Sequence, residues 1–159
     1  MKFNSALKNF VLVLFRTLLI SACSTAKKAS VDTVDDVYTG TDTVEYLANC
    51  VPDRVFFATN KSSLTTRSRD TLRKQATYLR KNKDLTVTIE GHADERGTRE
   101  YNLALGERRA NAAKDYLMTY GVSGKRISVI SYGKEKPVNQ ASSPLAWSQN
   151  RRSVTIKAN

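Results

Sequence analysis

The chain has 159 residues, a formal net charge of +11, two cysteines and one histidine. This length suits one ordinary domain with short appendages. Two cysteines exclude a disulfide-rich scaffold and a cysteine-based zinc site, and one histidine argues against a histidine-based metal site, so we expect neither metal nor cofactor. The positive charge favours a polyanionic partner, which could be nucleic acid, anionic lipid or a carboxylate-rich cell wall.

Residues 1–22 have the pattern of a secretory signal peptide. Lys2 and Lys8 precede an apolar stretch over residues 10–20, and small residues then lead up to Cys23. A cationic start, a short apolar core and small residues before the cleavage point are typical of exported proteins. A transmembrane anchor is the alternative, but the apolar stretch is shorter than the roughly 20 residues that span a bilayer.

The run Ile20-Ser21-Ala22-Cys23 resembles the lipobox of bacterial lipoproteins. In such proteins the cysteine thiol takes a diacylglyceryl group and becomes the mature N-terminus, so Cys23 is the expected lipidation site. Several acyl chains give stable anchoring where one chain would be marginal. Ser24 resembles the residue that sorts enteric lipoproteins to the outer membrane.

Residues 23–50 are predicted to be the lipidated cysteine and a flexible tether. The segment is rich in Ser, Thr, Asp, Lys and Ala and has no sustained apolar period. Cys50 at its end is predicted to be a partly buried thiol, although an exposed thiol there could form an intermolecular disulfide. Residues 51–159 are predicted to form the folded domain.

Strand and helix signals alternate through this domain. Period-two alternation or short apolar runs predict strands, and apolar residues at helical spacing predict helices. The predicted strands are residues 55–57, 85–90, 127–132 and 152–158, the helices are residues 63–81 and 99–120 with Gly121 as the stop, and residues 133–146 are a loop. The order β-α-β-α-β-β indicates an α/β (α+β) sandwich, with two helices packed on one face of a mixed sheet.

The candidate binding residues lie where the second predicted strand passes through a polar loop into the second helix. Asp94 follows the strand, and Asn102, Leu105 and Arg109 are spaced to share one face of the helix. An Asp and an Arg held near each other suit a zwitterion, because the carboxylate accepts from an ammonium group and the guanidinium fork binds a carboxylate. The alternative is that Asp94 and Arg109 pair with each other and cap the helix.

Three motifs in this region resemble the signature of the OmpA-like peptidoglycan-binding family, and especially its lipoprotein members. They are Gly-His-Ala-Asp-Glu-Arg-Gly-Thr at residues 91–98, Leu-Gly-Glu-Arg-Arg-Ala-Asn at residues 105–111 and Ser-Tyr-Gly-Lys-Glu-Lys-Pro at residues 131–137. The resemblance covers about residues 55–156 and keeps the family's motif order and spacing. It implies the family's sandwich fold, and it implies binding of the diaminopimelate in the peptide stem of peptidoglycan.

The same resemblance implies roles for individual residues. The family's key Asp falls on Asp94 and its key Arg on Arg109, while Asn102 and Leu105 match supporting helix positions. A further contact loop follows the first strand, where similar members usually show Phe-Asp. This chain has Thr59 and Asn60 there. Asn keeps hydrogen-bonding capacity without the charge and Thr loses aromatic area, so weaker affinity is expected.

Other polar residues invite different interpretations. His92 lies near Asp94, but no nucleophile motif accompanies it, so we predict a packed or hydrogen-bonded strand residue. The basic pairs at residues 108–109 and 151–152 are predicted to be solvated or ligand-facing, since no aromatic residues interleave with them as in a single-strand nucleic-acid binder. Trp147 is predicted to pack the last loop against the domain.

These features predict a non-enzymatic outer-membrane lipoprotein with a periplasmic domain that binds peptidoglycan and couples the membrane to the cell wall. Many weak attachments in parallel would give the coupling its strength. The resemblance also implies partnership with the Tol proteins, notably the periplasmic propeller protein TolB, and a role in cell division. The rival hypotheses are a cell-wall hydrolase and a basic nucleic-acid binder, and we expect no nucleic-acid partner.

Overall fold

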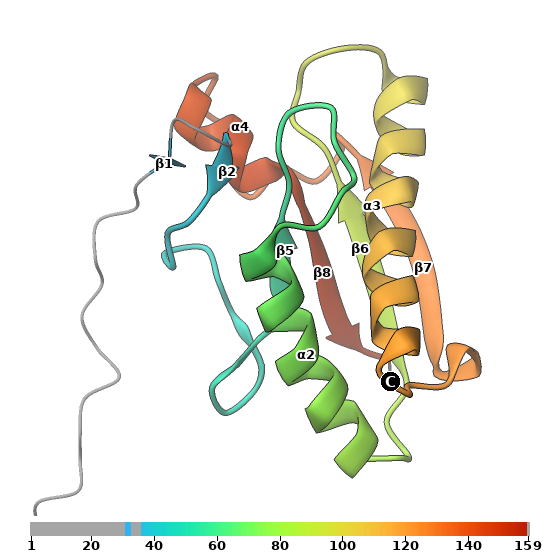
Figure 1. Ribbon diagram of the computed structural model, residues 1–159. Coiled ribbons are helices and arrows are strands. Elements are labelled where there is room, and N and C mark those ends of the chain that lie inside the picture. Colours follow the sequence, from blue (N-terminus) through green and yellow to red (C-terminus); the bar gives the residue numbers. More distant parts are fainter. Residues whose placement is uncertain (1–30, 33–35, 159) are drawn as a thin grey trace, which may run out of the picture.

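The computed structural model describes residues 31–32 and 36–158. The signal peptide at residues 1–22, the lipidation site Cys23 and the first part of the tether therefore lie outside the described residues, and those predictions stay predictions. The elements are β1 (Val31–Asp32), β2 (Val37–Tyr38), β3 (Tyr46–Ala48), β4 (Val51–Pro52), β5 (Arg54–Phe56), α2 (Thr66–Lys81), β6 (Val87–His92), α3 (Arg99–Thr119), the 3₁₀ turn η1 (Gly124–Arg126), β7 (Ile127–Gly133), α4 (Pro144–Asn150) and β8 (Arg152–Lys157) (Figure 1).

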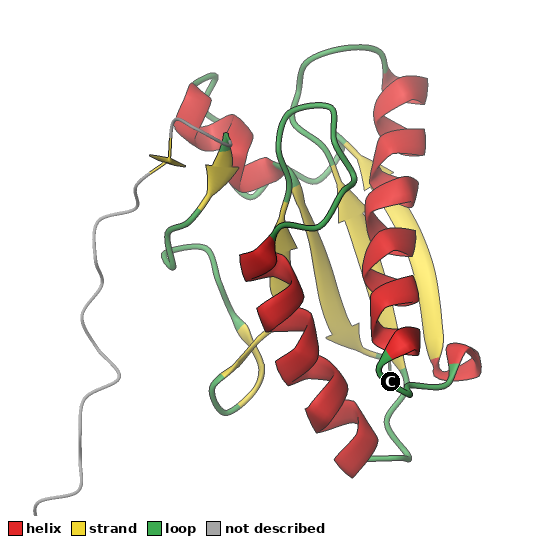
Figure 2. Ribbon diagram, viewed as in Figure 1, coloured by secondary structure: helices red, strands yellow, loops and turns green. Residues whose placement is uncertain are grey.

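The main sheet has four strands in the order β5-β8-β6-β7. Strand β6 runs parallel to β7, and β8 runs antiparallel to both β5 and β6. Helices α2 and α3 lie side by side on one face of this sheet (Figure 2). The predicted α/β sandwich is therefore confirmed. The mixed topology also brings the carboxyl ends of β5, β6 and β7 to one end of the molecule.

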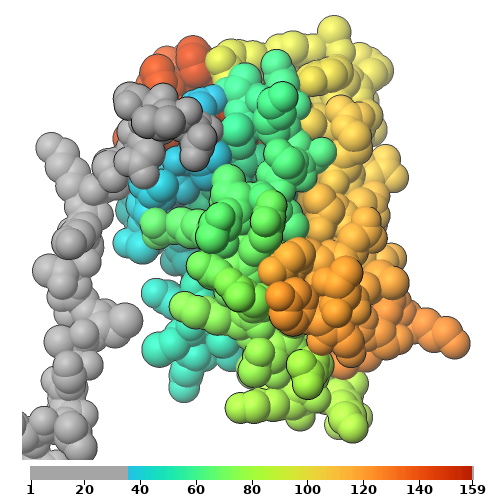
Figure 3. Space-filling view, viewed as in Figure 1, coloured from blue at the N-terminus to red at the C-terminus, as the bar shows by residue number. Residues whose placement is uncertain are grey.

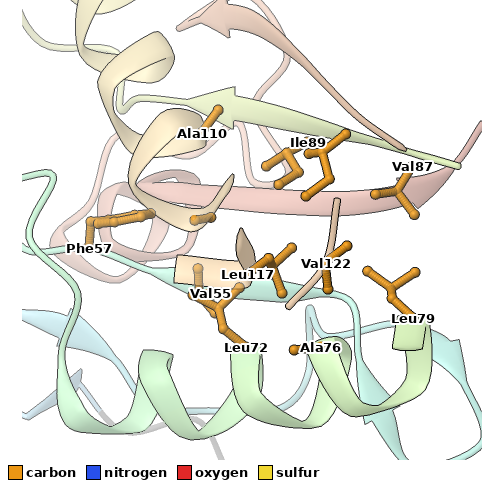
Figure 4. Packing of buried hydrophobic residues seen from close by; sticks show 12 residues of the cluster. Val55, Phe57, Leu72, Ala76, Leu79, Val87, Ile89, Ala110, Leu117 and Val122 are labelled. Carbon is orange, nitrogen blue, oxygen red and sulfur yellow. The ribbon is translucent and has the colours of Figure 1, made fainter. Parts of the chain in front are cut away.

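The core lies between the two helices and the sheet (Figure 4). Leu72, Ala76 and Leu79 follow each other at helical spacing on α2 and are at most 1% exposed. They face buried residues of the strands and of α3, including Val55, Ile89 and Leu117 in the sheet-facing cluster. Each large apolar side chain buried in this way contributes roughly 1.5–3 kcal/mol.

Capping residues set the helix ends. Thr65 Oγ1 accepts from the backbone N–H of Ser68, so α2 begins after Thr65 and the predicted start at residue 63 was early. Thr98 caps α3 in the same way, and Gly121 ends it with a left-handed φ of 83°. The predicted stop at Gly121 is confirmed.

The sequence analysis predicted a loop over residues 133–146 and did not predict helix α4. Ser143 Oγ accepts from the backbone N–H of Ala146, and Pro144 occupies the first turn. Both residues are typical of a helix start. The seven-residue helix has little apolar periodicity of its own, and it is held instead by burial of Ala146 and of the polar residues that follow it.

The tether prediction needs correction for residues 36–50, which we call the N-terminal segment. Val37, Tyr38 and Leu47 are at most 6% exposed, and the Tyr38 ring packs edge-on against Phe56 at 4.7 Å. Figure 3 shows the blue residues of this segment lying against the green residues that follow them. Isolated apolar residues among polar ones gave no periodic signal, although they pack on the domain. Cys50 is exposed, which contradicts its predicted partial burial.

Strand β6 and helix α3 approach each other closely at two glycines. A Cβ atom placed on Gly91 would lie 1.8 Å from the carbonyl oxygen of Gly106, and one on Gly106 would lie 2.8 Å from that of Gly91. Backbone contact of this kind fixes the height of α3 over the strand that carries Asp94. Among the described residues, no helix is both long and apolar enough to cross a membrane.

Candidate functional site

A pocket of about 360 Å³ opens at the end of the sheet where β5 and β6 finish. The loop after β5 and the loop between β6 and α3 form its walls. Its lining residues are Thr59, Asn60, Asp94, Arg96, Gly97 and Tyr101. Three of these six residues, Thr59, Asn60 and Asp94, were predicted from the sequence, so the structure brings two distant motifs into one site.

Asp94 is the buried charge of the pocket, with 7% of its surface exposed. Its Oδ1 accepts from the backbone N–H and the Nε of Arg96, both at 3.1 Å. Its Oδ2 accepts from Arg96 Nη2 at 2.7 Å and from Arg151 Nη1 at 3.3 Å. Burial alone would raise the pKa of Asp94, but the hydrogen bonds from Arg96 and Arg151 outweigh it and lower the pKa. Asp94 is therefore a carboxylate at neutral pH.

Arg96 forms the exposed side of this charge cluster. Its side chain is 42% exposed, and its guanidinium carbon lies 4.3 Å from the centre of the Trp147 ring. Trp147 in turn donates from Nε1 to Glu95 Oε1 at 2.8 Å. The prediction that Trp147 packs against the domain is confirmed, although the residue lies on α4 rather than in a loop. Arg96 is thus stacked and paired but remains open to solvent.

Arg109 does not reach the pocket, and it does not pair with Asp94. It is fully buried, and its guanidinium donates to three backbone carbonyls, those of Lys61, His92 and Ala58, at 2.9, 2.8 and 3.1 Å. Burial and the nearby Arg151 charge lower the pKa of Arg109 to about 10, so it is still cationic at neutral pH. Arg109 joins the loop after β5 to the end of β6, directly beneath the pocket walls.

Asn102 and Leu105 share the buried face of α3 with Arg109, as their spacing predicted. Asn102 is 2% exposed and donates from Nδ2 to the carbonyl oxygen of Arg96 at 2.8 Å. Leu105 is 3% exposed. Neither residue lines the pocket. Asn102 therefore fixes the backbone of the loop that carries Arg96, without contacting the pocket itself.

Thr59 and Asn60 lie in the wall formed by the loop after β5. Asn60 is exposed and has a left-handed φ of 56°, a conformation that Asn tolerates better than most residues. Thr59 donates its backbone N–H to Asp36 Oδ2 at 3.3 Å, and its hydroxyl donates to the same oxygen. Arg96 Nη2 lies 3.4 Å from the Thr59 hydroxyl oxygen.

The sequence reasoning missed several residues that build this site. Arg96 follows Asp94 by two positions in a loop, a spacing that allows a local carboxylate–guanidinium pair and could have revealed it. Arg151 was predicted to be solvated or ligand-facing, and that is wrong because it is 1% exposed. Asp36 lies 115 residues from its partner Arg151, and no local signal links the two.

His92 is a packed strand residue, as predicted. It is 1% exposed, and its ring lies 5.6 Å from that of Tyr132. Burial and the charges of Arg152, Lys136 and Arg54 lower its pKa to about 3. Such a histidine stays neutral at physiological pH, so it is poorly suited to acid–base chemistry there.

The pKa of His92 predicts a pH-dependent stability. The folded protein keeps the ring neutral, whereas the unfolded chain takes up a proton below pH 6.5. The contribution is therefore complete at pH 7 and is lost as the pH falls toward 3, at up to about 1.4 kcal/mol per pH unit. Urea unfolding at pH 7 and pH 5 should show a smaller loss for His92→Asn than for the parent. Equal losses would contradict the buried, neutral state.

A second pocket, of about 620 Å³, lies near the carboxyl end of α2. Its charged lining residues are all basic: Arg80, Lys81, Lys83 and Arg126. Arg126 donates to the carbonyls of Leu79, Asn82 and Leu85, where it caps the helix end. The described residues contain no group of three or more histidine, cysteine or acidic residues that could hold a metal ion.

The comparisons with known proteins agree with this fold. Residues 56–151 match the OmpA family. A peptidoglycan-associated lipoprotein of Brucella melitensis is 42% identical over 151 residues, which cover 91% of this chain and 89% of the relative. One from Rhizobium meliloti is 57% identical over 106 residues, which cover 67% of this chain and 60% of the relative. The chain belongs to the OmpA family.

The relatives refine this assignment. The crystal structure of the peptidoglycan-associated lipoprotein from Burkholderia pseudomallei superposes with a TM-score of 0.65 at 37% identity, covering 67% of this chain and 90% of that one. The C-terminal domain of Helicobacter pylori MotB, at 20% identity and a TM-score of 0.63, covers 67% of this chain and 84% of its own and shares the fold alone. The resemblance to the family's lipoprotein members is therefore confirmed, although the chain spans only about 60% of the length of its rhizobial relatives.

Proposed function

We propose that this protein is a non-enzymatic outer-membrane lipoprotein whose periplasmic domain binds peptidoglycan non-covalently. The ligand is the diaminopimelate of the peptide stem, held in the pocket at the end of the sheet. The relatives are named as peptidoglycan-associated lipoproteins, which supports peptidoglycan as the target. The observation that carries the choice of ligand is the buried Asp94 carboxylate, with the exposed Arg96 guanidinium at its side.

The geometry suits a zwitterion through an exchange of partners. Asp94 accepts four hydrogen bonds, which is about as many as a carboxylate can accept. Arg96 donates three of these four bonds. An ammonium group that displaces the Arg96 side chain would take its place on Asp94. The released guanidinium would then meet the carboxylate on the same carbon of the ligand. Arg96 thus takes the carboxylate-binding role that the family resemblance implied for Arg109.

The first test is sedimentation of the chain from Ser24 onward, which keeps every described residue, with purified sacculi that contain diaminopimelate. The parent is expected to pellet with the sacculi. Asp94→Asn keeps the shape of the side chain and removes its charge, and it is expected to weaken binding at least tenfold, about 1.4 kcal/mol. Because Arg151 loses a partner, circular dichroism must show that the variant is folded.

Two controls give this experiment its specificity. Sacculi with lysine in place of diaminopimelate lack the side-chain carboxylate and should bind much more weakly. Lys81→Ala, in the basic pocket at the carboxyl end of α2, should bind like the parent. Equal binding to both kinds of sacculi would contradict diaminopimelate as the ligand, and failure of the parent to pellet would contradict peptidoglycan binding.

The lipid anchor and the protein partners belong to the same proposal. Cys23 carries the acyl chains and holds the domain at the outer membrane, and TolB and the other Tol proteins are its partners in envelope integrity and cell division. The lipobox and the family assignment support both statements. Metabolic labelling with palmitate should mark the parent but not Cys23→Ala. Zymography should show no clearing of peptidoglycan, as expected of a binding protein rather than a hydrolase.

A further inference from the structure

Five side chains form a closed ring at the base of the pocket, and we call them the charge ring: Asp36, Arg151, Asp94, Arg96 and Thr59. Asp36 Oδ1 accepts from Arg151 Nη2 at 2.7 Å, and Arg151 Nη1 donates to Asp94 Oδ2 at 3.3 Å. Arg96 Nη2 donates to Asp94 Oδ2 at 2.7 Å and lies 3.4 Å from Thr59 Oγ1. Thr59 closes the ring by donating its hydroxyl and its backbone N–H to Asp36 Oδ2.

Asp36 is the only ring member that comes from the N-terminal segment. Its backbone has a left-handed φ of 52°, and its carbonyl oxygen accepts a further bond from Arg151 Nη2. The next two residues, Val37 and Tyr38, are buried against Phe56. Packing of this segment therefore sets where the Asp36 carboxylate lies, even though the side chain is 47% exposed.

We propose that Asp36 is a positioning residue of the binding site. It acts through two partners without lining the pocket itself, and the inference rests on the proposed function. Through Thr59, its carboxylate fixes the wall formed by the loop after β5. Through Arg151, it supplies a second anion to a guanidinium that is 1% exposed.

The charge balance shows why this second partner matters. The ring holds two carboxylates and two guanidinium groups. Without Asp36, Asp94 would be the one carboxylate left in the ring to neutralise the buried Arg151. A stronger Arg151–Asp94 pair would then compete with the ammonium group of the ligand. Asp36 thus leaves Asp94 available to the ligand.

The experiment compares Asp36→Ala with Asp42→Ala in the chain from Ser24 onward. Asp42 belongs to the same segment and accepts from Gln149 Nε2 at 3.1 Å, outside the ring. Asp36→Ala is expected to weaken binding to diaminopimelate-containing sacculi about tenfold, and Asp42→Ala by less than twofold. Amide hydrogen exchange should speed up at Thr59 in Asp36→Ala while the amides of β6 keep their protection.

A double-mutant cycle with Thr59→Val tests the route of the effect. If Asp36 acts through Thr59, the double variant should bind less weakly than the product of the two single effects predicts. Unchanged or tighter binding of Asp36→Ala would overturn the inference, and so would a loss of protection across the whole domain. If the parent itself does not pellet, the proposed function fails, and unchanged exchange at Thr59 in Asp36→Ala would separately overturn the positioning role.

Discussion

Gly91→Ala is expected to destabilise the domain by about 3 kcal/mol or more, although it removes no interaction and only adds a methyl group. The added Cβ would lie 1.8 Å from the carbonyl oxygen of Gly106 and 2.5 Å from its carbon. Both atoms belong to the backbone of α3, so no side-chain rotation relieves the clash. Either β6 or α3 has to move, and both contribute residues to the hydrophobic core.

The effect should also reach the binding site, because Asp94 follows β6 by two residues. Urea unfolding, followed by the fluorescence of the single Trp147, measures the loss of stability. Gly124→Ala is the matched control: its new Cβ would meet only the end of the flexible Met118 side chain, at 3.1 Å, and should cost less than about 0.5 kcal/mol. Equal midpoints for Gly91→Ala and the parent would show that β6 and α3 do not approach as described.

Arg109→Met is expected to cost about 3–5 kcal/mol of stability and to abolish binding to sacculi. Methionine fills much of the same volume but removes the guanidinium that donates to the carbonyls of Lys61, His92 and Ala58. The Ala58 carbonyl keeps its bond from the Lys61 backbone N–H, so the other two carbonyls bear most of the loss. A buried polar group left unsatisfied costs about 1–3 kcal/mol. Loss of the buried charge itself offsets part of this cost, so the sum of two such terms is an upper limit.

A lysine at the same position separates charge from geometry. Arg109→Lys keeps the charge but lacks the planar fork that reaches three acceptors in different directions, so an intermediate loss of stability is expected. Arg108→Met is the control, because that side chain is exposed and its guanidinium carbon lies 5.9 Å from the ring centre of Tyr101. If Arg109→Lys were as stable as the parent, the carbonyl contacts would not be what holds the loop.

The sequence predicted the sandwich well because its local signals agree with its tertiary structure. The alternation in β6, the spacing of Leu72, Ala76 and Leu79, and the glycine stop at Gly121 each report the environment of a single element. Helix α4 was missed because its capping motif, Ser143-Pro144, is short and because the helix itself lacks an apolar stripe. Its stability comes from contacts made with distant parts of the chain.

The candidate site was predicted in part, for a related physical reason. Asp94, Thr59 and Asn60 line one pocket, since strand ends at one edge of a sheet meet in space. The contacts of Arg109 could not be predicted from the sequence, because an arginine that binds backbone carbonyls has the same sequence pattern as one that binds a ligand. The contributions of Asp36 and Arg151 depend on a contact between the two ends of the domain.

The packing of the N-terminal segment changes how load would pass between membrane and wall. If Cys23 carries the anchor, the chain between it and Asp36 reaches at most about 47 Å even when fully extended. Anchor and ligand would then pull on the same end of the domain. Tension would run from Asp36 through Arg151 to Asp94, a path of two ion pairs, and also into β5 through the packing of Val37 and Tyr38 on Phe56. A pull on the anchor would therefore load the binding site directly, together with the packing of the N-terminal segment on β5.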